Sequence, residues 1–321
     1  MMVEKYKIRT DLAMEQKERF ESDHVEVSGV VLEEEYDEEK EIKITTVRIE
    51  TENGAKAMGK PVGTYLTLEA PNMAAADEGY HREISETLAD FLEKYMKDTE
   101  ENQEKGYSVL VVGLGNREVT PDALGPYVVD QLNVTRHIVQ EYGRYAVGKG
   151  GSRIVSAIVP GVMAQTGMET GEIVEGIVKK IHPDALVVID ALAAKSSERL
   201  NRTIQISNTG IAPGSGVGNH RNEITEKTMG IPVIAIGVPT VISIPSLACD
   251  IMEAFCASQG EGMEDIFCSW PEKEKYHFLG EILDEKLWEL FVTPKEIDEA
   301  VKRISYTLSE GINQFVAGRI F

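Results

Sequence analysis

Apolar residues gather in short runs through the middle of the chain, and amphipathic segments separate the runs. Uninterrupted apolar runs rich in β-branched residues are typical of strands that are buried on both faces of a parallel sheet. The pattern predicts central strands at residues 109–112, 154–159, 185–193, 203–207 and 232–242. Residues 167–180 carry apolar side chains at helical spacing, as expected of a crossover helix. This order predicts an α/β fold with a doubly wound, mostly parallel sheet.

The N-terminal part of the chain has a different pattern, in which apolar and polar residues alternate. Alternation with a period of two is typical of antiparallel strands with one solvated face. Such strands are predicted at residues 25–32, 42–49 and 63–68, within a region of about 24–70. The acidic residues 33–40 are expected to form a hairpin loop, and Asn53 with Gly54 a turn. The strands should pair at the edge of the parallel sheet or form a small subdomain.

Helical patterns precede and follow the predicted central sheet. Residues 78–97 carry apolar side chains at helical spacing, which predicts an amphipathic helix. From about 246 to 321 the pattern is mainly helical, whereas the first residues of the chain have no packing pattern and are expected to form an extended arm. A length of 321 residues can bury a large core, so residues 12–321 are predicted to form a single domain.

Composition excludes several classes of function. The formal net charge is −21, from 54 acidic and 33 basic residues, which argues against a nucleic-acid-binding surface. The three cysteines, Cys249, Cys256 and Cys268, match no common zinc spacing and are expected to be buried thiols. The sequence has no signal peptide and no apolar run of membrane-spanning length. These features predict a soluble, intracellular protein without a membrane partner.

Two acidic residues are associated with buried strands of the predicted sheet. Asp122 lies between two prolines in the loop after residues 109–112, and Asp190 lies near the C-terminal end of the strand at 185–193. Ligands of open α/β sheets bind at this edge, so the two carboxylates are candidates for an acid–base pair that activates water and polarises a carbonyl. The alternatives are a helix cap at Asp122 or a shared divalent metal. The sequence shows no HExxH motif and no obvious third metal ligand.

Two glycine-rich loops are candidate binding sites. Residues 113–118 begin like a dinucleotide-binding loop but lack its third glycine, so no cofactor is predicted. In the loop 210–221, glycines would let a substrate strand approach closely, and a histidine and an arginine would meet an acidic group; an ordinary surface loop is the alternative. The candidate substrate-binding residues of this loop are Gly214, Gly216, His220 and Arg221. Ser215 does not follow a strand, which argues against a serine hydrolase.

At these residues the chain resembles the spore germination protease family of endospore-forming bacteria. The resemblance covers most of the chain and rests on long motifs. They are residues 9–13 (RTDLA), 113–116 (GLGN), 120–126 (TPDALGP), 161–170 (GVMAQTGMET), 188–192 (VIDAL), 208–210 (NTG) and 213–219 (PGSGVGN). The family's proposed catalytic aspartates fall on Asp122 and Asp190. The family fold resembles that of the hydrogenase-maturation proteases, in which the corresponding acids meet nickel, so metal assistance stays an alternative to an atypical aspartic mechanism.

The resemblance implies an endopeptidase that degrades the small acid-soluble, DNA-protecting proteins of the spore during germination. It also implies a homotetramer in the cytoplasm of the forespore and in the spore core, with no direct nucleic-acid contact. Members are made as zymogens and are cut between an acidic residue and a large apolar residue that alanine follows. Asp11-Leu12-Ala13 fits that pattern, which implies a propeptide of residues 1–11 and self-processing between Asp11 and Leu12. The alternative is a non-enzymatic metal- or peptide-binding sensor that uses the same acidic cleft.

Overall fold

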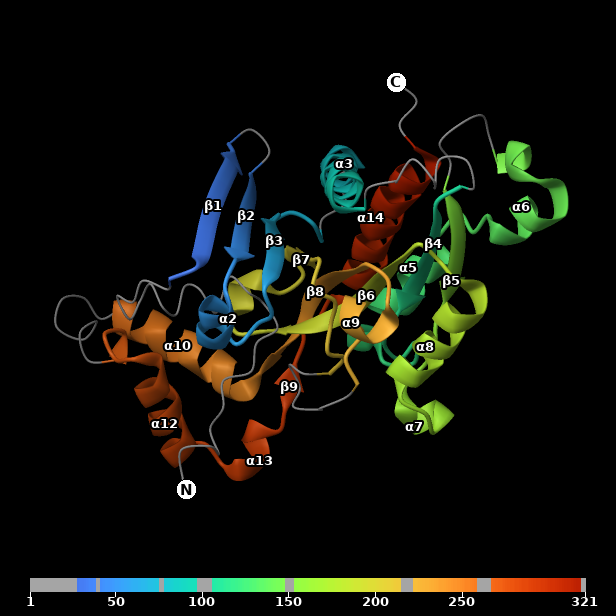
Figure 1. Cartoon of the computed structure of the whole chain (residues 1–321). Helices are drawn as coiled ribbons and strands as arrows, with labels where there is room; N and C mark the ends of the chain where they lie inside the picture. The colour runs from blue at the N-terminus through green and yellow to red at the C-terminus, as the bar shows by residue number, and fades with distance from the viewer. Residues whose placement is uncertain are drawn as a thin grey trace.

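The computed structural model contains one sheet with helices on both faces (Figure 1). It describes residues 28–38, 41–74, 78–96, 106–147, 153–214, 222–258 and 267–318. The predicted processing site at Asp11 and Leu12, and the start of the predicted strand 25–32, lie outside these ranges.

The sheet of the described ranges has nine strands in the order β1-β2-β3-β7-β8-β6-β4-β5, and β9 pairs with β8 beyond this path. The strands are β1 (Val30–Asp37), β2 (Ile42–Ile49), β3 (Gly63–Glu69), β4 (Ser108–Gly113), β5 (Ile154–Ile158), β6 (Ala185–Ala194), β7 (Thr203–Ser207), β8 (Val233–Ser243) and β9 (Phe291–Val292). The neighbours β8, β6, β4 and β5 are parallel. The pairs from β1 to β8 through β2, β3 and β7 are antiparallel, as is β8 with β9. The predicted α/β class, with a parallel core and antiparallel N-terminal strands at its edge, is therefore confirmed.

Alternate residues of β4 explain why helices cover both faces of the parallel core. Val109 and Val111 pack into the larger core with α3 (Glu78–Tyr95) and α14 (Ile297–Ala317). Leu110 and Val112 point to the other face. The helix α5 (Leu124–Asp130) packs on the first face, and α8 (Thr170–Ile181) and α9 (Glu226–Met229) pack on the second. Side chains of a strand alternate between the two faces of the sheet. A strand in which consecutive residues are apolar therefore needs helices on both faces.

Five further helices of the described ranges lie between β4 and α14 in the chain. They are α6 (Arg136–Tyr142), α7 (Met163–Thr166), α10 (Ile244–Ser258), α12 (Glu272–Ile282) and α13 (Glu285–Trp288). The C-terminal region is mainly helical, and β9 interrupts it. The three cysteines are free thiols of this region, and burial, followed by the charge of Glu253, raises the pKa of Cys249 to about 12. Within the described ranges, no helix is long and apolar enough to cross a membrane.

Two N-terminal predictions are wrong. Residues 33–37, expected in a hairpin loop, continue β1 because their charges are compensated across the strand pair: Glu33 contacts Arg48, and Glu34 lies 2.9 Å from Lys43. The turn expected at Asn53 and Gly54 belongs instead to the helix α2 (Glu52–Met58). The Thr51 side chain caps this helix by accepting a hydrogen bond from the Gly54 amide, at 3.1 Å.

Candidate active site

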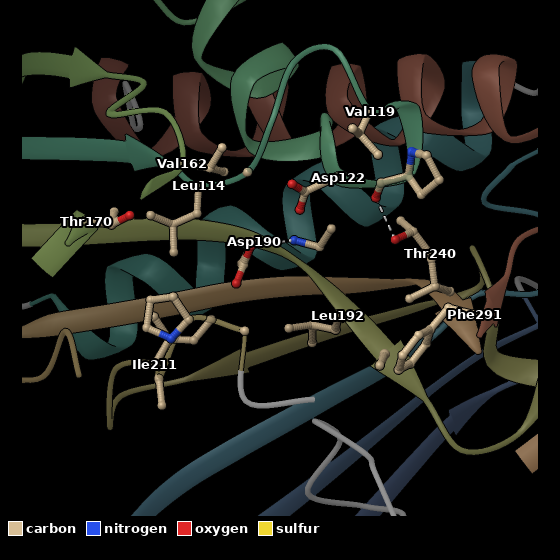
Figure 2. A pocket seen from close by; sticks show the side chains of 18 of the residues that line it. Leu114, Val119, Asp122, Val162, Thr170, Asp190, Leu192, Ile211, Thr240 and Phe291 are labelled. Atoms are coloured by element: carbon tan, nitrogen blue, oxygen red, sulfur yellow. Dashed lines mark hydrogen bonds between the residues drawn. The ribbon is translucent and has the colours of Figure 1, made fainter. Parts of the chain in front are cut away.

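A pocket of about 360 Å³ opens at the edge where β4 and β6 deliver their C-terminal ends. Asp122 and Asp190 both line it, and Figure 2 shows the two side chains on neighbouring parts of its wall. Most of the other lining side chains are apolar, among them Leu114, Val162 and Ile211. The structure therefore brings the two predicted aspartates to one site at the predicted edge of the sheet.

Asp122 is held in a short 3-10 turn, Thr120–Asp122, that begins just after the loop of β4. Its amide donates a hydrogen bond to the Val119 carbonyl at 2.8 Å, and its Oδ2 accepts one from the Asn116 amide at 2.7 Å. The following helix, α5, has Ala123 at its N-cap and no capping side chain. Asp122 is thus not a helix cap, and its carboxylate is oriented by the backbone of the loop before it.

The glycines of this loop permit close packing. Gly115 has a φ of +109°, and a Cβ on it would lie 1.9 Å from the Asp122 carbonyl oxygen. Gly125 of α5 packs directly on the backbone of Leu114 and Ile189. Both glycines of the GxG motif are explained by close backbone packing, because a Cβ on Gly113 would likewise lie 2.2 Å from the Gly125 carbonyl oxygen.

Asp190 lies inside β6, four residues before the strand ends, and only 7% of it is exposed. It pairs in register with Gly237 of β8, and its Oδ1 accepts a hydrogen bond from the Ala191 amide at 3.0 Å. The Leu114 amide donates to the Ile189 carbonyl at 2.8 Å. This bond ties the Asp122 loop to the residue before Asp190, so the backbone sets the relation between the two carboxylates.

The glycine-rich loop contributes in part. Gly214 lines the pocket together with Ile211, Ala212 and Pro213. A β-bridge between Ile211 and Ile224 closes the base of the loop. The other candidate residues of this loop, Gly216, His220 and Arg221, lie outside the described ranges.

Two further pocket residues, and one residue next to the Asp122 loop, were not predicted from the sequence. Gln165, in the GVMAQTGMET motif, donates a hydrogen bond to Asn116 Oδ1 at 3.1 Å. Thr240 of β8 and Phe291 of β9 also line the pocket, and Figure 2 shows Phe291 next to Thr240. Pro239, which interrupts the apolar run 232–242 just before Thr240, was a visible signal for Thr240, whereas nothing around Phe291 indicates its position.

A second hollow of about 230 Å³ adjoins the pocket. Leu192, Ile211 and Ala212 line both spaces, so the two are neighbours across a shared wall. The second hollow is more polar at its rim, where Lys60 and Glu223 contribute. Together the two spaces offer room for several consecutive residues of a bound polypeptide.

The two carboxyl groups that line the pocket are suited to acid–base chemistry. Two carboxylates in near contact can share a proton, so that one accepts a proton while the other donates a hydrogen bond. Among the described residues, no group of three or more histidine, cysteine or acidic side chains is placed to hold a metal ion. Within the same described ranges, the carboxylates that could hold a metal in this pocket are those of Asp122 and Asp190.

The fold and the pocket define an α/β protein with a carboxylate pair at the edge of a parallel core, an arrangement suited to hydrolysis. Residues 8–266 match the family model described as germination protease. The chain belongs to the germination protease family, as its sequence motifs predicted, and is a protease.

Curated relatives agree with this match. A germination protease of Clostridium perfringens is 46% identical over 315 residues, covering 96% of this chain and 94% of the relative. That of Caldanaerobacter subterraneus subsp. tengcongensis is 46% identical over 312 residues, covering 95% and 93%. That of Priestia megaterium is 39% identical over 351 aligned positions, covering 96% and 93%. Among solved structures, a NiFe hydrogenase maturation protease from Thermococcus kodakarensis KOD1 is 17% identical, with a TM-score of 0.28, and covers 47% of this chain and 80% of that chain.

Proposed function

We propose that the chain is an endopeptidase that begins the degradation of small acid-soluble, DNA-protecting spore proteins during germination. The observation that carries the proposal is that Asp122 and Asp190 face one pocket. The adjoining hollow supports an extended polypeptide as the substrate, because a chain that passes over the shared residues Leu192, Ile211 and Ala212 would occupy both spaces. The family membership supports a protease with a role in germination.

In the proposed reaction, the ionised carboxylate of the pair takes a proton from a water molecule while the water oxygen bonds to the scissile carbonyl carbon. The protonated carboxyl donates a hydrogen bond to the carbonyl oxygen and stabilises the charge that develops there. The tetrahedral intermediate then collapses, the peptide C–N bond breaks, and the leaving nitrogen receives a proton from the pair. The Asn116 amide keeps the Asp122 carboxylate in place during these steps.

Incubation with small acid-soluble proteins extracted from spores tests this function. We expect internal cleavage of these proteins, seen as defined fragments by mass spectrometry. We also expect the rate to be unchanged after treatment with a chelator, because the carboxylate pair itself activates the water. Loss of activity in chelator, restored by one divalent ion, would move the mechanism to metal-assisted hydrolysis. Intact substrate in every condition would contradict the proposed function.

We propose further that the chain is made as a zymogen and removes its own residues 1–11 by cleavage between Asp11 and Leu12. The three residues would fix which peptide bond lies at the catalytic pair. Asp11 would supply a charge, Leu12 would fill an apolar pocket, and Ala13 would fit where a larger side chain would not. N-terminal sequencing of the matured protein should begin at Leu12. Asp11→Lys and Asp122→Asn should both remain full length, whereas Glu4→Lys, with the same change of charge outside the motif, should mature normally. A mature Asp11→Lys protein would contradict the assignment.

The proposed assembly is a homotetramer in the cytoplasm of the forespore and spore core, with no direct contact to nucleic acid or membrane. Ile251 and Phe255, one turn apart on α10, are 59% and 51% exposed. Apolar side chains on one face of a helix support a contact between subunits. Sedimentation of the sequenced mature sample measures the assembly, and a monomer mass would contradict a tetramer.

A further inference from the structure

Thr240 occupies an irregular position of β8 next to the turn that carries Asp122. Leu192 of β6 is opposite Pro239, whereas Ala193 is opposite Val241, so Thr240 is the extra residue of a bulge. Bulges beside active sites commonly redirect one side chain out of the regular alternation of a strand. Thr240 is 1% exposed, and its Oγ1 donates a hydrogen bond to the Pro121 carbonyl at 2.7 Å, drawn as a dashed line in Figure 2.

A second hydrogen bond holds the bulge from the other side. The Thr293 hydroxyl, just after β9, donates to the Thr240 carbonyl at 2.7 Å. β9 is itself paired with β8 through Ile242–Val292 and Ser243–Phe291. A continuous series of contacts therefore runs from β9 through the bulge to Pro121, the residue before Asp122. The far end of this series, Thr293, lies beyond residues 8–266 that the family model matches.

We propose that Thr240 is a positioning residue for Asp122, which fixes the 3-10 turn and thereby the carboxylate in the pocket. The inference rests on the proposed role of Asp122 in hydrolysis. The turn is short, and its own backbone hydrogen bonds are local: the Asp122 amide donates to the Val119 carbonyl, and the Ala123 amide donates to the Thr120 carbonyl. The Thr240 hydrogen bond connects the turn to the sheet, and Asp190 lies in the same sheet. It thus connects the turn that carries Asp122 to β8, the strand beside Asp190.

The test compares Thr240→Val, which removes the hydroxyl at nearly constant shape, with Thr240→Ser, which keeps it. Cleavage of acid-soluble spore protein by Thr240→Val should show kcat lowered by about tenfold to a hundredfold, since small displacements of a catalytic group cost on that order. KM should stay near the wild-type value, because the apolar walls that bind substrate are intact. Thr240→Ser should restore most of kcat, and Thr293→Val should lower kcat less than Thr240→Val.

The control is Thr307→Val in α14, which also removes a buried threonine hydroxyl; this hydroxyl donates to the Arg303 carbonyl and contacts the His81 ring. It should lower the thermal midpoint without changing kcat. In the Asp122→Asn background, Thr240→Val should cause no additional loss, because a residue that acts through Asp122 has nothing left to position.

Each outcome has a separate meaning when Asp122→Asn is assayed in parallel. A folded Thr240→Val with normal kcat, beside an inactive Asp122→Asn, would overturn the positioning role and leave the proposed function standing. An active Asp122→Asn would overturn the proposed function itself. A raised KM at constant kcat, or no recovery in Thr240→Ser, would show that Thr240 contributes to binding or to packing and not to the position of Asp122.

Discussion

Asp122→Asn and Asp190→Asn are each expected to give a folded protein whose proteolytic activity is lower by about a hundredfold or more, the usual scale of lost general acid–base catalysis. Asparagine has the shape of aspartate but neither accepts a proton from water nor donates one to a leaving group. The backbone hydrogen bonds to the Asp122 and Asp190 side chains, from the Asn116 and Ala191 amides, can still be made to an amide oxygen. The loss should therefore appear in kcat and not in the thermal midpoint.

Asp130→Asn is the matched control for these variants. Asp130 ends α5, eight residues after Asp122, and its half-exposed carboxylate pairs with Arg117 on the surface. Exposed ion pairs contribute on the order of 0–1 kcal/mol, so this variant should keep its activity and nearly all its stability. Wild-type rates in Asp122→Asn or Asp190→Asn, with a normal melting curve, would remove the pair from the mechanism.

Gly125→Ala is expected to cause the largest loss of stability, on the order of 3 kcal/mol, the upper end for overpacking a tight contact. An added Cβ would lie 2.4 Å from the Leu114 carbonyl oxygen, 2.6 Å from the Leu114 nitrogen and 2.7 Å from the Ile189 carbonyl oxygen. All three are backbone atoms, so no side chain can rotate away to make room. Urea denaturation measures the change, and activity should fall as well because α5 and the Asp122 loop are forced apart.

Gly176→Ala provides the opposite control. Gly176 lies on the exposed side of α8, and a Cβ there meets no atom within 4 Å. Alanine should stabilise the helix by about 0.5–1 kcal/mol, because glycine is the poorer helix former. If Gly125→Ala were as stable as the wild type, or Gly176→Ala were equally destabilised, close backbone packing would not be the reason for glycine at position 125.

The pattern of side chains was sufficient to predict the parallel core. The run at 109–112 is apolar in both phases, and the structure accordingly buries alternate residues of β4 under helices on opposite faces. Asp122 and Asp190 could be chosen because each lies in or after such a buried strand, where a carboxylate has little reason to be placed for packing alone. These inferences succeed because periodicity and polarity are properties of the local sequence.

Local sequence patterns were misleading where residues from distant parts of the chain pair with the segment in the fold. The acidic residues after Leu32 suggest a loop, but Arg48 and Lys43 on the neighbouring strand compensate Glu33 and Glu34 and let β1 continue. The same limit applied to Asp122, for which a helix cap and a functional site were equally compatible with the sequence. The Asn116 amide and the common pocket with Asp190 distinguish the two, and both depend on how the chain folds back.

By itself, the sequence determined the α/β class, the antiparallel N-terminal strands and the two candidate aspartates, because strand burial and alternation are encoded residue by residue. Only the tertiary structure decided that Asp122 and Asp190 line one pocket, that Gly125 must lack a side chain, and that Thr240 bonds to Pro121 in the turn that carries Asp122. The last of these depends on a one-residue bulge and on Thr293, 53 positions further along the chain. Register and contacts between distant segments arise from which surfaces fit together, and no local pattern of polar and apolar residues specifies that fit.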